Sequence, residues 1–262
     1  MNLVPLSPLL AGALASLLAG LLTAIGALPV LLRHRVSPRT TDVMLGFAAG
    51  VMLAAAFFSL ILPGLDAARS QFDLGLLPAL VITAGVLAGA LAVDALNAIV
   101  PHEHFKQGRE GPGGAAIGRV WLFVLAITIH NLPEGLAVGV GFGGGDITAG
   151  TMLATGIGLQ NVPEGLAVAL ALRSVGHGPW QAFAIAGLTG LVEPVTGTLG
   201  AWAVSVSSLL LPWSMTFAAG AMIYVISHEI IPDTHRHGAQ RPATYGLMGG
   251  LALMMLLDTA FG

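Results

Sequence analysis

The sequence predicts an all-α integral membrane protein with eight transmembrane helices. Only 9% of its 262 residues are charged and 55% are hydrophobic, whereas charged residues make up about a quarter of an ordinary soluble domain. The mean hydropathy is +0.86. The apolar residues form runs long enough to cross a bilayer, which takes roughly 20 residues per helix. These runs lack the alternation of period two that would indicate a β-barrel.

Eight runs meet the length requirement. In chain order they cover residues 7–32, 43–65, 76–99, 119–143, 148–172, 179–206, 209–231 and 242–261. The first has no basic segment before it and is longer than the apolar part of a cleaved signal peptide, so we expect it to remain as a helix. No stretch outside the runs is long enough for a soluble domain. We therefore expect a single polytopic membrane domain over 1–262, with a flexible inner loop at 101–118.

The basic residues predict the orientation. If both termini lie outside, nine of the ten Lys and Arg residues fall on the inner side and only Arg69 falls on the outer side. This asymmetry favours an N-out, C-out arrangement, because cytoplasmic loops of membrane proteins carry the excess of Lys and Arg. The inner residues are Arg33, Arg35, Arg39, Lys106, Arg109, Arg119, Arg173, Arg236 and Arg241.

Two other classes of function have little support. The chain has no cysteine, so it forms neither disulfides nor thiolate metal sites. A net charge of −3 without any basic patch gives no indication of nucleic acid as a partner.

Three glutamates lie well inside apolar runs: Glu134, Glu164 and Glu193. An ionised carboxylate in the middle of a bilayer costs about 2.5–3.5 kcal/mol even on insertion scales, and it normally faces the bundle interior with a partner. All Lys and Arg residues fall at or near the ends of the runs. The compensating charge must therefore be protons on the glutamates or a cation that is not part of the chain.

Two related motifs surround the first two glutamates, HNLPEG at 130–135 and QNVPEG at 160–165. His130 and Glu134 are four residues apart and so share one helix face, and Asn131 lies three residues before Glu134 on an adjoining strip. The second motif repeats this geometry. We expect Pro133 and Pro163 to kink the fourth and fifth helices, because each proline removes a backbone hydrogen bond and leaves a carbonyl free to line a polar cavity.

If the fourth and fifth helices face one another, Glu134 and Glu164 can each serve two neighbouring cations. The first site would gather His130, Glu134, Gln160 and Glu164. The second would gather Asn131, Glu134, Asn161, Glu164 and Glu193. Imidazole with carboxylate suits Zn, Fe, Mn, Ni or Co, whereas an alkali cation would not require histidine. Without thiolates a tight structural zinc site is disfavoured. The composition of the site predicts a first-row divalent metal that is held and then released.

Four segments carry a family resemblance: HNLPEGLAVGVGFG, GLQNVPEGLAVALALR, LVEP around Glu193, and AGAMIYVISHEIIPDTHR near the C-terminus. Together they resemble the ZIP (Zrt/Irt-like) family of divalent metal transporters, in particular its bacterial members. The resemblance covers nearly the whole chain. It implies zinc as the main substrate, with Cd, Fe and Mn as further substrates, carried inward across the cytoplasmic (inner) membrane. It also implies a homodimer, and a bundle of helices one, four, five and six that moves against the rest.

The resemblance also implies which residues form the binuclear metal site. They are His130, Asn131, Glu134, Gln160, Asn161, Glu164 and Glu193, with Met52 in the second helix as an additional contact. Many relatives place His where this chain has Gln160, and some place Asp where it has Asn161. The first difference removes a nitrogen ligand and the second removes a charge, so we expect broader metal selectivity and a weaker second site.

Other polar residues are candidates for the paths to and from this site. Ser59 and Asp66 would line an outer access path, although a carboxylate at a helix end is also common without a function. Candidate inner contacts are His102, Glu103, His104, His228, Glu229, His235 and His237. Those in the loop also fit a solvated linker. We expect Asp94, Asn97 and Asp258 to be structural hydrogen-bonding residues.

An intramembrane zinc-dependent hydrolase is the alternative function. In that case His130 and the glutamates would hold a zinc ion with an open position for water. The sequence has no HExxH motif and no nucleophile with an orienting base, and its duplicated motif makes two similar half-sites. We therefore expect a carrier and not an enzyme.

Overall fold

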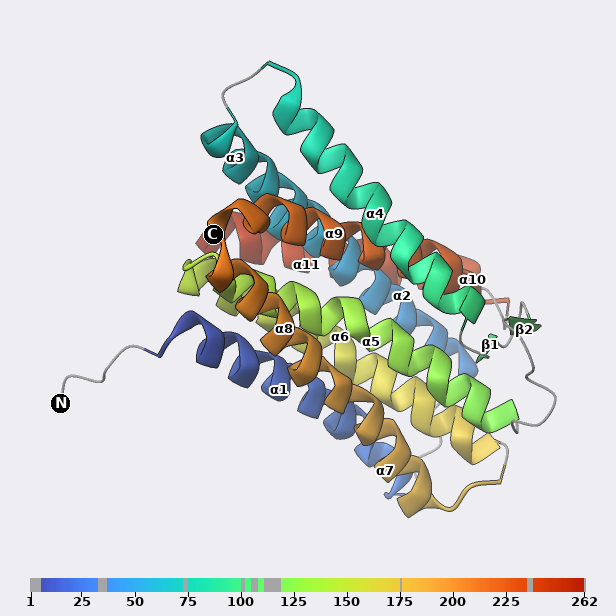
Figure 1. Cartoon of the computed structure of the whole chain (residues 1–262). Helices are drawn as coiled ribbons and strands as arrows, with labels where there is room; N and C mark the ends of the chain where they lie inside the picture. The colour runs from blue at the N-terminus through green and yellow to red at the C-terminus, as the bar shows by residue number, and fades with distance from the viewer. Residues whose placement is uncertain are drawn as a thin grey trace.

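The computed structural model is a bundle of long helices that run in alternating directions (Figure 1). The structure describes residues 6–32, 37–72, 75–99, 102–104, 108–110, 119–174, 176–234 and 238–261. Each of the eight predicted ranges is helical. The α-helices are α1 (Pro8–Ala27), α2 (Pro38–Ala54), α3 (Leu62–Gln71), α4 (Leu77–Ile99), α5 (Arg119–Gly143), α6 (Ile147–Ser174), α7 (Pro179–Thr189), α8 (Glu193–Val206), α9 (Leu211–Val225), α10 (Ile231–Thr234) and α11 (Gln240–Phe261).

Shorter helical segments join some of these helices into longer rods. A π-helical segment, Ala55–Ile61, connects α2 to α3, and another, Ile226–Ile230, connects α9 to α10. Turns of 3₁₀ helix lie at Leu28–Val30, Gly190–Val192 and Ser208–Leu210. The sixth predicted run is thus made of α7 and α8, and the seventh of α9 with its π-helical extension.

The second predicted run, 43–65, is the one whose ends differ most from the structure. The α2–α3 rod begins at Pro38 and ends at Gln71. Ser37 caps its start, with its side chain accepting a hydrogen bond from the backbone N–H of Thr40, and a proline occupies the first helical position. The apolar run marks only the part of a helix that is suited to lipid, so polar turns at each end were missed.

Six helical stretches are long and apolar enough to cross a membrane, as judged over the described residues. They are Pro8–Val30, Pro38–Gln71, Leu77–Ile99, Pro179–Val206, Ser208–Ile230 and Gln240–Ala260. The helices α5 and α6, with 25 and 28 residues, carry the two polar motifs and are not among the six. The first turn of α1 and the last turn of α11 lie at the same end of the bundle (Figure 1). A total of eight crossings and the N-out, C-out orientation stay predictions.

The expected flexible loop at 101–118 contains secondary structure in its described part. Strands β1 (His102–His104) and β2 (Gly108–Glu110) pair antiparallel, with His102 opposite Glu110. This hairpin is a small departure from a purely helical fold. The residues at 105–107 and 111–118 lie outside the described part of the chain.

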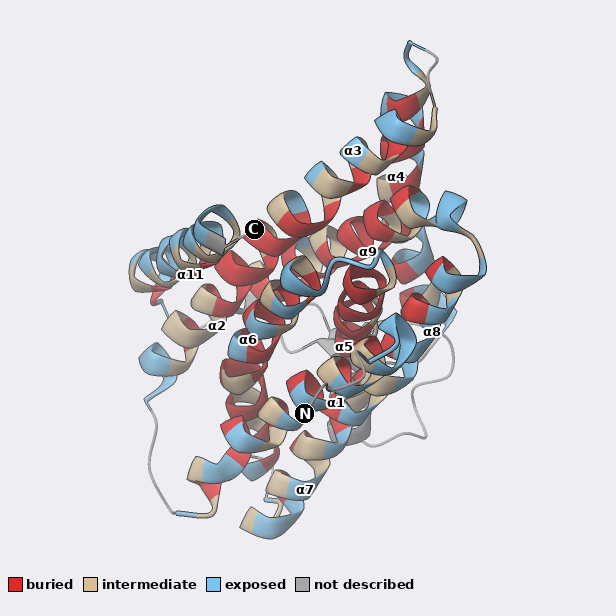
Figure 2. Cartoon of the chain, turned by 90° about the vertical axis from the view of Figure 1, so that its left-hand side faces the viewer, coloured by how far each residue is buried: buried red, intermediate tan, exposed pale blue. Residues whose placement is uncertain are grey.

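The helices pack in two groups. In the first group, α1 packs against α6 and α8, and α5 also packs against α8. In the second group, α2 packs against α11 and α4 against α9. The two groups meet where α6 contacts α2 and α5 contacts α9. Buried residues gather on α5 and the helices around it, while α11 presents many exposed residues (Figure 2). The polar motifs of α5 and α6 therefore lie in the interior of the bundle.

Both prolines of these motifs lie inside continuous helices, Pro133 in α5 and Pro163 in α6. The kinks expected at these positions stay predictions. Close packing holds α5 in place, because a Cβ atom on Gly139 would collide with the backbone carbonyl of Gly197 in α8.

Candidate metal centre

Two neighbouring helices and the start of a third supply the seven polar residues of the predicted site. His130, Asn131 and Glu134 lie on α5, and the corresponding residues of the second motif lie on α6. Glu193 is the first residue of α8, directly after a 3₁₀ turn. All seven side chains are buried, with at most 5% of any residue exposed. The seven are His130, Asn131, Glu134, Gln160, Asn161, Glu164 and Glu193.

An imidazole and two carboxylates form the centre of this arrangement. The Nε2 atom of His130 lies 3.5 Å from Oε1 of Glu164 and 3.9 Å from Oε1 of Glu134. One ligand atom from each of the three residues lies within 4.8 Å of the others. The spacing of four residues on α5 thus directs His130 and Glu134 to one face, and α6 brings Glu164 to meet them. Three donors so close together could hold one metal ion.

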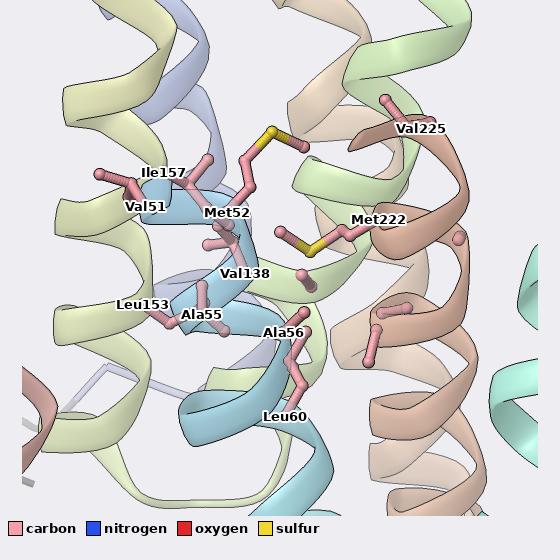
Figure 3. Close-up of a cluster of buried hydrophobic side chains, with 14 of the residues drawn as sticks. Val51, Met52, Ala55, Ala56, Leu60, Val138, Leu153, Ile157, Met222 and Val225 are labelled. Carbon is pink, nitrogen blue, oxygen red and sulfur yellow. The ribbon is translucent and has the colours of Figure 1, made fainter. Parts of the chain in front are cut away.

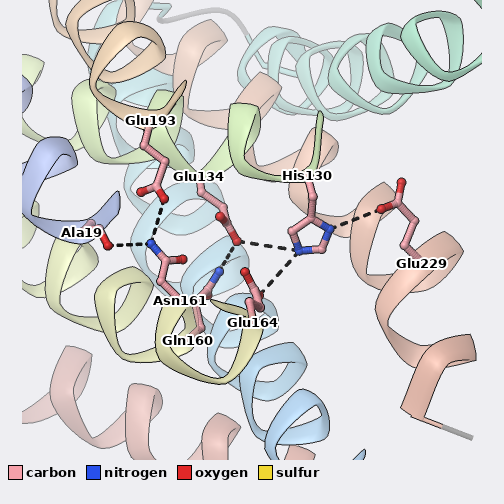
Figure 4. A network of polar contacts seen from close by, with 8 residues as sticks. All are labelled: Ala19, His130, Glu134, Gln160, Asn161, Glu164, Glu193 and Glu229. Atoms are coloured by element: carbon pink, nitrogen blue, oxygen red, sulfur yellow. Dashed lines mark hydrogen bonds and ion pairs between the residues drawn. The ribbon is translucent and has the colours of Figure 1, made fainter. Parts of the chain in front are cut away.

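Two side-chain amides position the carboxylates. The Nε2 atom of Gln160 donates a hydrogen bond to Glu134. The Nδ2 atom of Asn161 donates to Oε1 of Glu193 at 2.8 Å, and also to the backbone carbonyl of Ala19 in α1 at 2.8 Å. Figure 4 shows the resulting row, in which Glu193 and Asn161 lie on one side of Glu134, and His130 and Glu164 on the other. Because both amides use their nitrogen atoms as donors, their oxygen atoms remain available as ligands.

Each of the seven buried residues has one polar atom without a hydrogen-bond partner in the described part of the chain. These atoms are His130 Nε2, Asn131 Oδ1, Glu134 Oε2, Gln160 Oε1, Asn161 Oδ1, Glu164 Oε1 and Glu193 Oε2. Leaving a buried polar group unpaired costs about 1–3 kcal/mol, and more for a charged group. All the oxygen atoms among them are acceptors, and His130 Nε2 is an acceptor when Nδ1 carries the proton. The seven atoms form a donor set suited to a cation.

The structure adds Glu229 to the surroundings of His130. Oε2 of Glu229, in the π-helical segment after α9, lies 3.3 Å from Nδ1 of His130. The side-chain amide of Asn97 in α4 donates to the other oxygen of Glu229, at 3.5 Å. The sequence suggested Glu229 only as an inner contact and Asn97 only as a structural residue. A carboxylate on the second ring nitrogen fixes the orientation of a metal-binding histidine, and no local spacing shows this contact, because the two residues are 99 positions apart.

Met52 and the residues proposed for the outer path occupy different surroundings. Met52 is fully buried on α2 within the apolar core. Ser59 is buried and donates a hydrogen bond of 2.8 Å to Oδ1 of Asp258 in α11. Asp66 has an exposed side chain that lies 3.5 Å from Arg69. Ser59 and Asp66 are therefore not joined by a shared contact, and Asp258 makes the kind of hydrogen bond that the sequence suggested.

The inner histidines are described only in part. The ring of His228 stacks on Tyr224 at a centroid distance of 5.1 Å. His102, Glu103 and His104 form β1, and their side chains lie outside what the structure describes. His235 and His237 lie outside the described residues.

The bundle of apolar helices is that of a polytopic membrane protein, and the buried carboxylates and imidazole within ligand distance form a candidate metal site in its interior. The comparisons with known proteins identify the class further. The family described as ZIP zinc transporter matches residues 98–258. This chain belongs to that family, and its relatives place it with the bacterial members.

Two bacterial relatives match the chain over nearly its whole length. The zinc transporter GufA of Myxococcus xanthus is 48% identical over 252 residues, which cover 96% of this chain and 99% of the relative. The zinc transporter ZIPB of Bordetella bronchiseptica is 51% identical over 240 residues, which cover 92% of this chain and 78% of the relative.

A more distant relative is the zinc transporter ZIP11 of Homo sapiens. It is 34% identical over 322 residues, which cover 92% of this chain and 94% of the relative. The family and these relatives are named as transporters and not as enzymes. The hydrolase alternative is therefore not favoured.

Proposed function

We propose that this chain carries divalent metal ions, zinc foremost, through the buried site between α5 and α6 toward the cytoplasm. The observation that carries the proposal is the set of ligand atoms without a hydrogen-bond partner on seven buried residues, gathered around His130, Glu134 and Glu164. The names of its relatives support zinc as the substrate. Cd, Fe and Mn are further substrates in this proposal, because imidazole, carboxylate and amide ligands accept several divalent metals.

The site holds two metal ions in this proposal. His130, Gln160 and the two central glutamates contact the first ion. Asn131, Asn161 and Glu193 lie toward the second, which shares Glu134 and Glu164 with the first. The hydrogen bond from Asn161 to Glu193 supports this division, since it groups these two residues on the far side of Glu134 from His130 (Figure 4). An amide at position 161 supplies no negative charge, so the second ion binds more weakly.

The route through the protein has an outer and an inner part. Ser59 and Asp66 form the outer part of the proposed path, and Met52 is an additional contact at the metal site itself. Glu229 with His228 receives the ion on the inner side. The contact between Glu229 and His130 supports this inner step, because it joins the site to the end of α9. His102, Glu103, His104, His235 and His237 complete the inner path in this proposal.

Movement of one helix group against the other would expose the site to each side in turn. The proposed moving group is α1, α5, α6 and α7–α8, which pack closely with one another. The same proposal includes eight membrane crossings with N-out, C-out orientation and kinks at Pro133 and Pro163. It also includes a single membrane domain over 1–262, an inner-membrane location and a homodimer.

Uptake of radioactive zinc into proteoliposomes tests the proposal. Wild-type protein should take up zinc, and Glu134→Gln, Glu164→Gln and the double variant should each lose uptake, because every change removes a charge shared by both ions. Asp146→Asn is the matched control. Asp146 caps the exposed start of α6, accepting a hydrogen bond of 3.0 Å from the N–H of Ala149, and asparagine caps a helix equally well.

Near-normal uptake in either glutamate variant would refute the shared site. Absence of uptake by correctly inserted wild-type protein would refute carriage of zinc itself. Loss of uptake in the Asp146→Asn control as well would show that the changes act through folding and not through the site.

A further inference from the structure

A short stretch of sequence occurs twice in the second helix group. FAAGVM at 47–52 lies on α2 and FAAGAM at 217–222 lies on α9, so five of the six residues are identical. A π-helical segment follows each copy, Ala55–Ile61 after the first and Ile226–Ile230 after the second. The two rods share both sequence and an unusual backbone feature, and they run in opposite directions through the bundle.

The glycine of each copy lies in close contact with the backbone of another helix. A Cβ atom on Gly50 would collide with the carbonyl of Leu247 in α11. A Cβ atom on Gly220 would collide with the carbonyl of Val86 in α4. Each copy thus lets its helix pack backbone to backbone against one partner. The two stretches are therefore equivalent in sequence and in packing, and residues at the same position in each copy can be compared.

The last position of each copy is a methionine that faces the first helix group. Met52 and Met222 are both fully buried and belong to one core cluster. Figure 3 shows their side chains reaching from opposite helices into the same part of the interface, beside Val138 of α5 and Ile157 of α6. Val138 follows Glu134 by four residues and Ile157 precedes Gln160 by three. The methionine pair therefore lies about one helical turn, roughly 5 Å along the helix axis, from the ligand residues.

We propose that Met222 is a second thioether contact for the transported ion, opposite Met52, and that the pair favours soft cations such as Cd²⁺. The inference rests on the proposed function and adds a determinant of selectivity to it. The chain has no cysteine, so methionine sulfur is its only soft ligand. Thioethers bind soft metal ions in preference to hard ones. Methionine that only fills space can be replaced by leucine at nearly equal volume with little effect. Substitution by leucine therefore distinguishes a packing role from a role in binding the metal.

The test is the ratio of Cd²⁺ uptake to Zn²⁺ uptake in proteoliposomes. Met222→Leu should lower this ratio about tenfold while zinc uptake stays within about twofold of wild type, because one soft ligand is lost and the hard ligands remain. Met52→Leu should act in the same direction. Met254→Leu is the matched control, since Met254 is also fully buried but lies on α11 outside the repeat. It should leave the ratio unchanged.

Two results would overturn the inference and leave zinc carriage intact. One is a Met222→Leu variant with the same ratio of Cd²⁺ to Zn²⁺ uptake as an active wild type. The other is a Met254→Leu variant whose ratio falls as much as that of Met222→Leu. If wild-type protein carried neither metal, the proposed function would fail, and the inference with it.

A second measurement needs no substitution. Protein labelled with selenomethionine and loaded with Cd²⁺ alone should show selenium in the first coordination shell of cadmium by X-ray absorption, because a soft metal ion prefers a soft chalcogen donor. A coordination number near two supports the pair. One selenium overturns the proposed pair, and none refutes a thioether contact altogether.

Discussion

The orientation of His130 illustrates how one residue in the site depends on another helix. Its Nε2 atom faces Glu134 and Glu164 on one side, and Nδ1 faces Glu229 at 3.3 Å on the other. Asn97 in turn holds the Glu229 carboxylate through its side-chain amide. The ring of His130 is thus held in place by residues of α4 and of the π-helical segment after α9, which belong to the other helix group.

Replacement of Glu229 tests this arrangement at the level of a single residue. Glu229→Ala should weaken zinc binding about 10–100-fold, because residues that orient a ligand typically contribute that much to metal affinity. Glu229→Gln keeps an acceptor oxygen and should therefore lose less of the affinity for zinc. Isothermal titration of zinc into detergent-solubilised protein measures both.

The control for Glu229 is Asp94→Asn. Asp94 accepts a hydrogen bond of 2.6 Å from the hydroxyl of Tyr224 and so also links α4 to α9, but through a different pair of side chains from Asn97 and Glu229. The Asp94→Asn variant should bind zinc with the same affinity as wild type. Equal affinities in Glu229→Ala and wild type would show that the ring of His130 needs no partner at Nδ1.

At the level of helices, glycine at the seam between α5 and α8 sets how closely the site residues meet. Glu193 begins α8 and reaches the site only because α8 approaches α5 so closely. A Cβ atom on Gly139 would collide with the carbonyl of Gly197, and one on Gly135 would collide with the backbone of Glu193 itself. A side chain at either glycine would push Glu193 away from Glu134.

Gly139→Val should therefore destabilise the protein by about 1–3 kcal/mol or more, the range for overpacking a close contact. Thermal unfolding in detergent measures the loss. Gly249→Ala is the matched control, because nothing lies within 4 Å of a Cβ atom at that position in α11. It should be neutral, or stabilise by up to about 1 kcal/mol through helix propensity. A Gly139→Val variant as stable as wild type would mean that the α5–α8 contact is looser than described.

At the level of the whole molecule, the orientation in the membrane can be tested directly because the chain has no cysteine. Asp66 lies in α3, in the last part of the α2–α3 rod, and Arg173 lies near the end of α6; both side chains are exposed. An impermeant maleimide should label Asp66→Cys in intact cells and Arg173→Cys only after permeabilisation, because the basic residues favour the cytoplasmic side. Labelling of both from the same side would exclude an N-out, C-out arrangement.

The helices and the family were predictable from the sequence alone. Hydropathy located every long helix, since the apolar length needed to cross a bilayer is a local property of the chain. Its errors were polar helix ends such as Pro38–Asp42, which are helical but not apolar. The face shared by His130 and Glu134 was likewise predictable, because helical periodicity places residues four apart together.

Contacts between helices distant in sequence were decided only by the tertiary structure. Glu229 meets His130 across 99 residues, and Ser59 meets Asp258 across 199. Such pairs cannot be predicted from the spacing of residues along the chain. They depend on how helix surfaces pack and on close approach at glycines such as Gly139 and Gly50. The sequence by itself determined which residues could bind a metal. The packing of the helices decided which of them meet, and which residues hold them there.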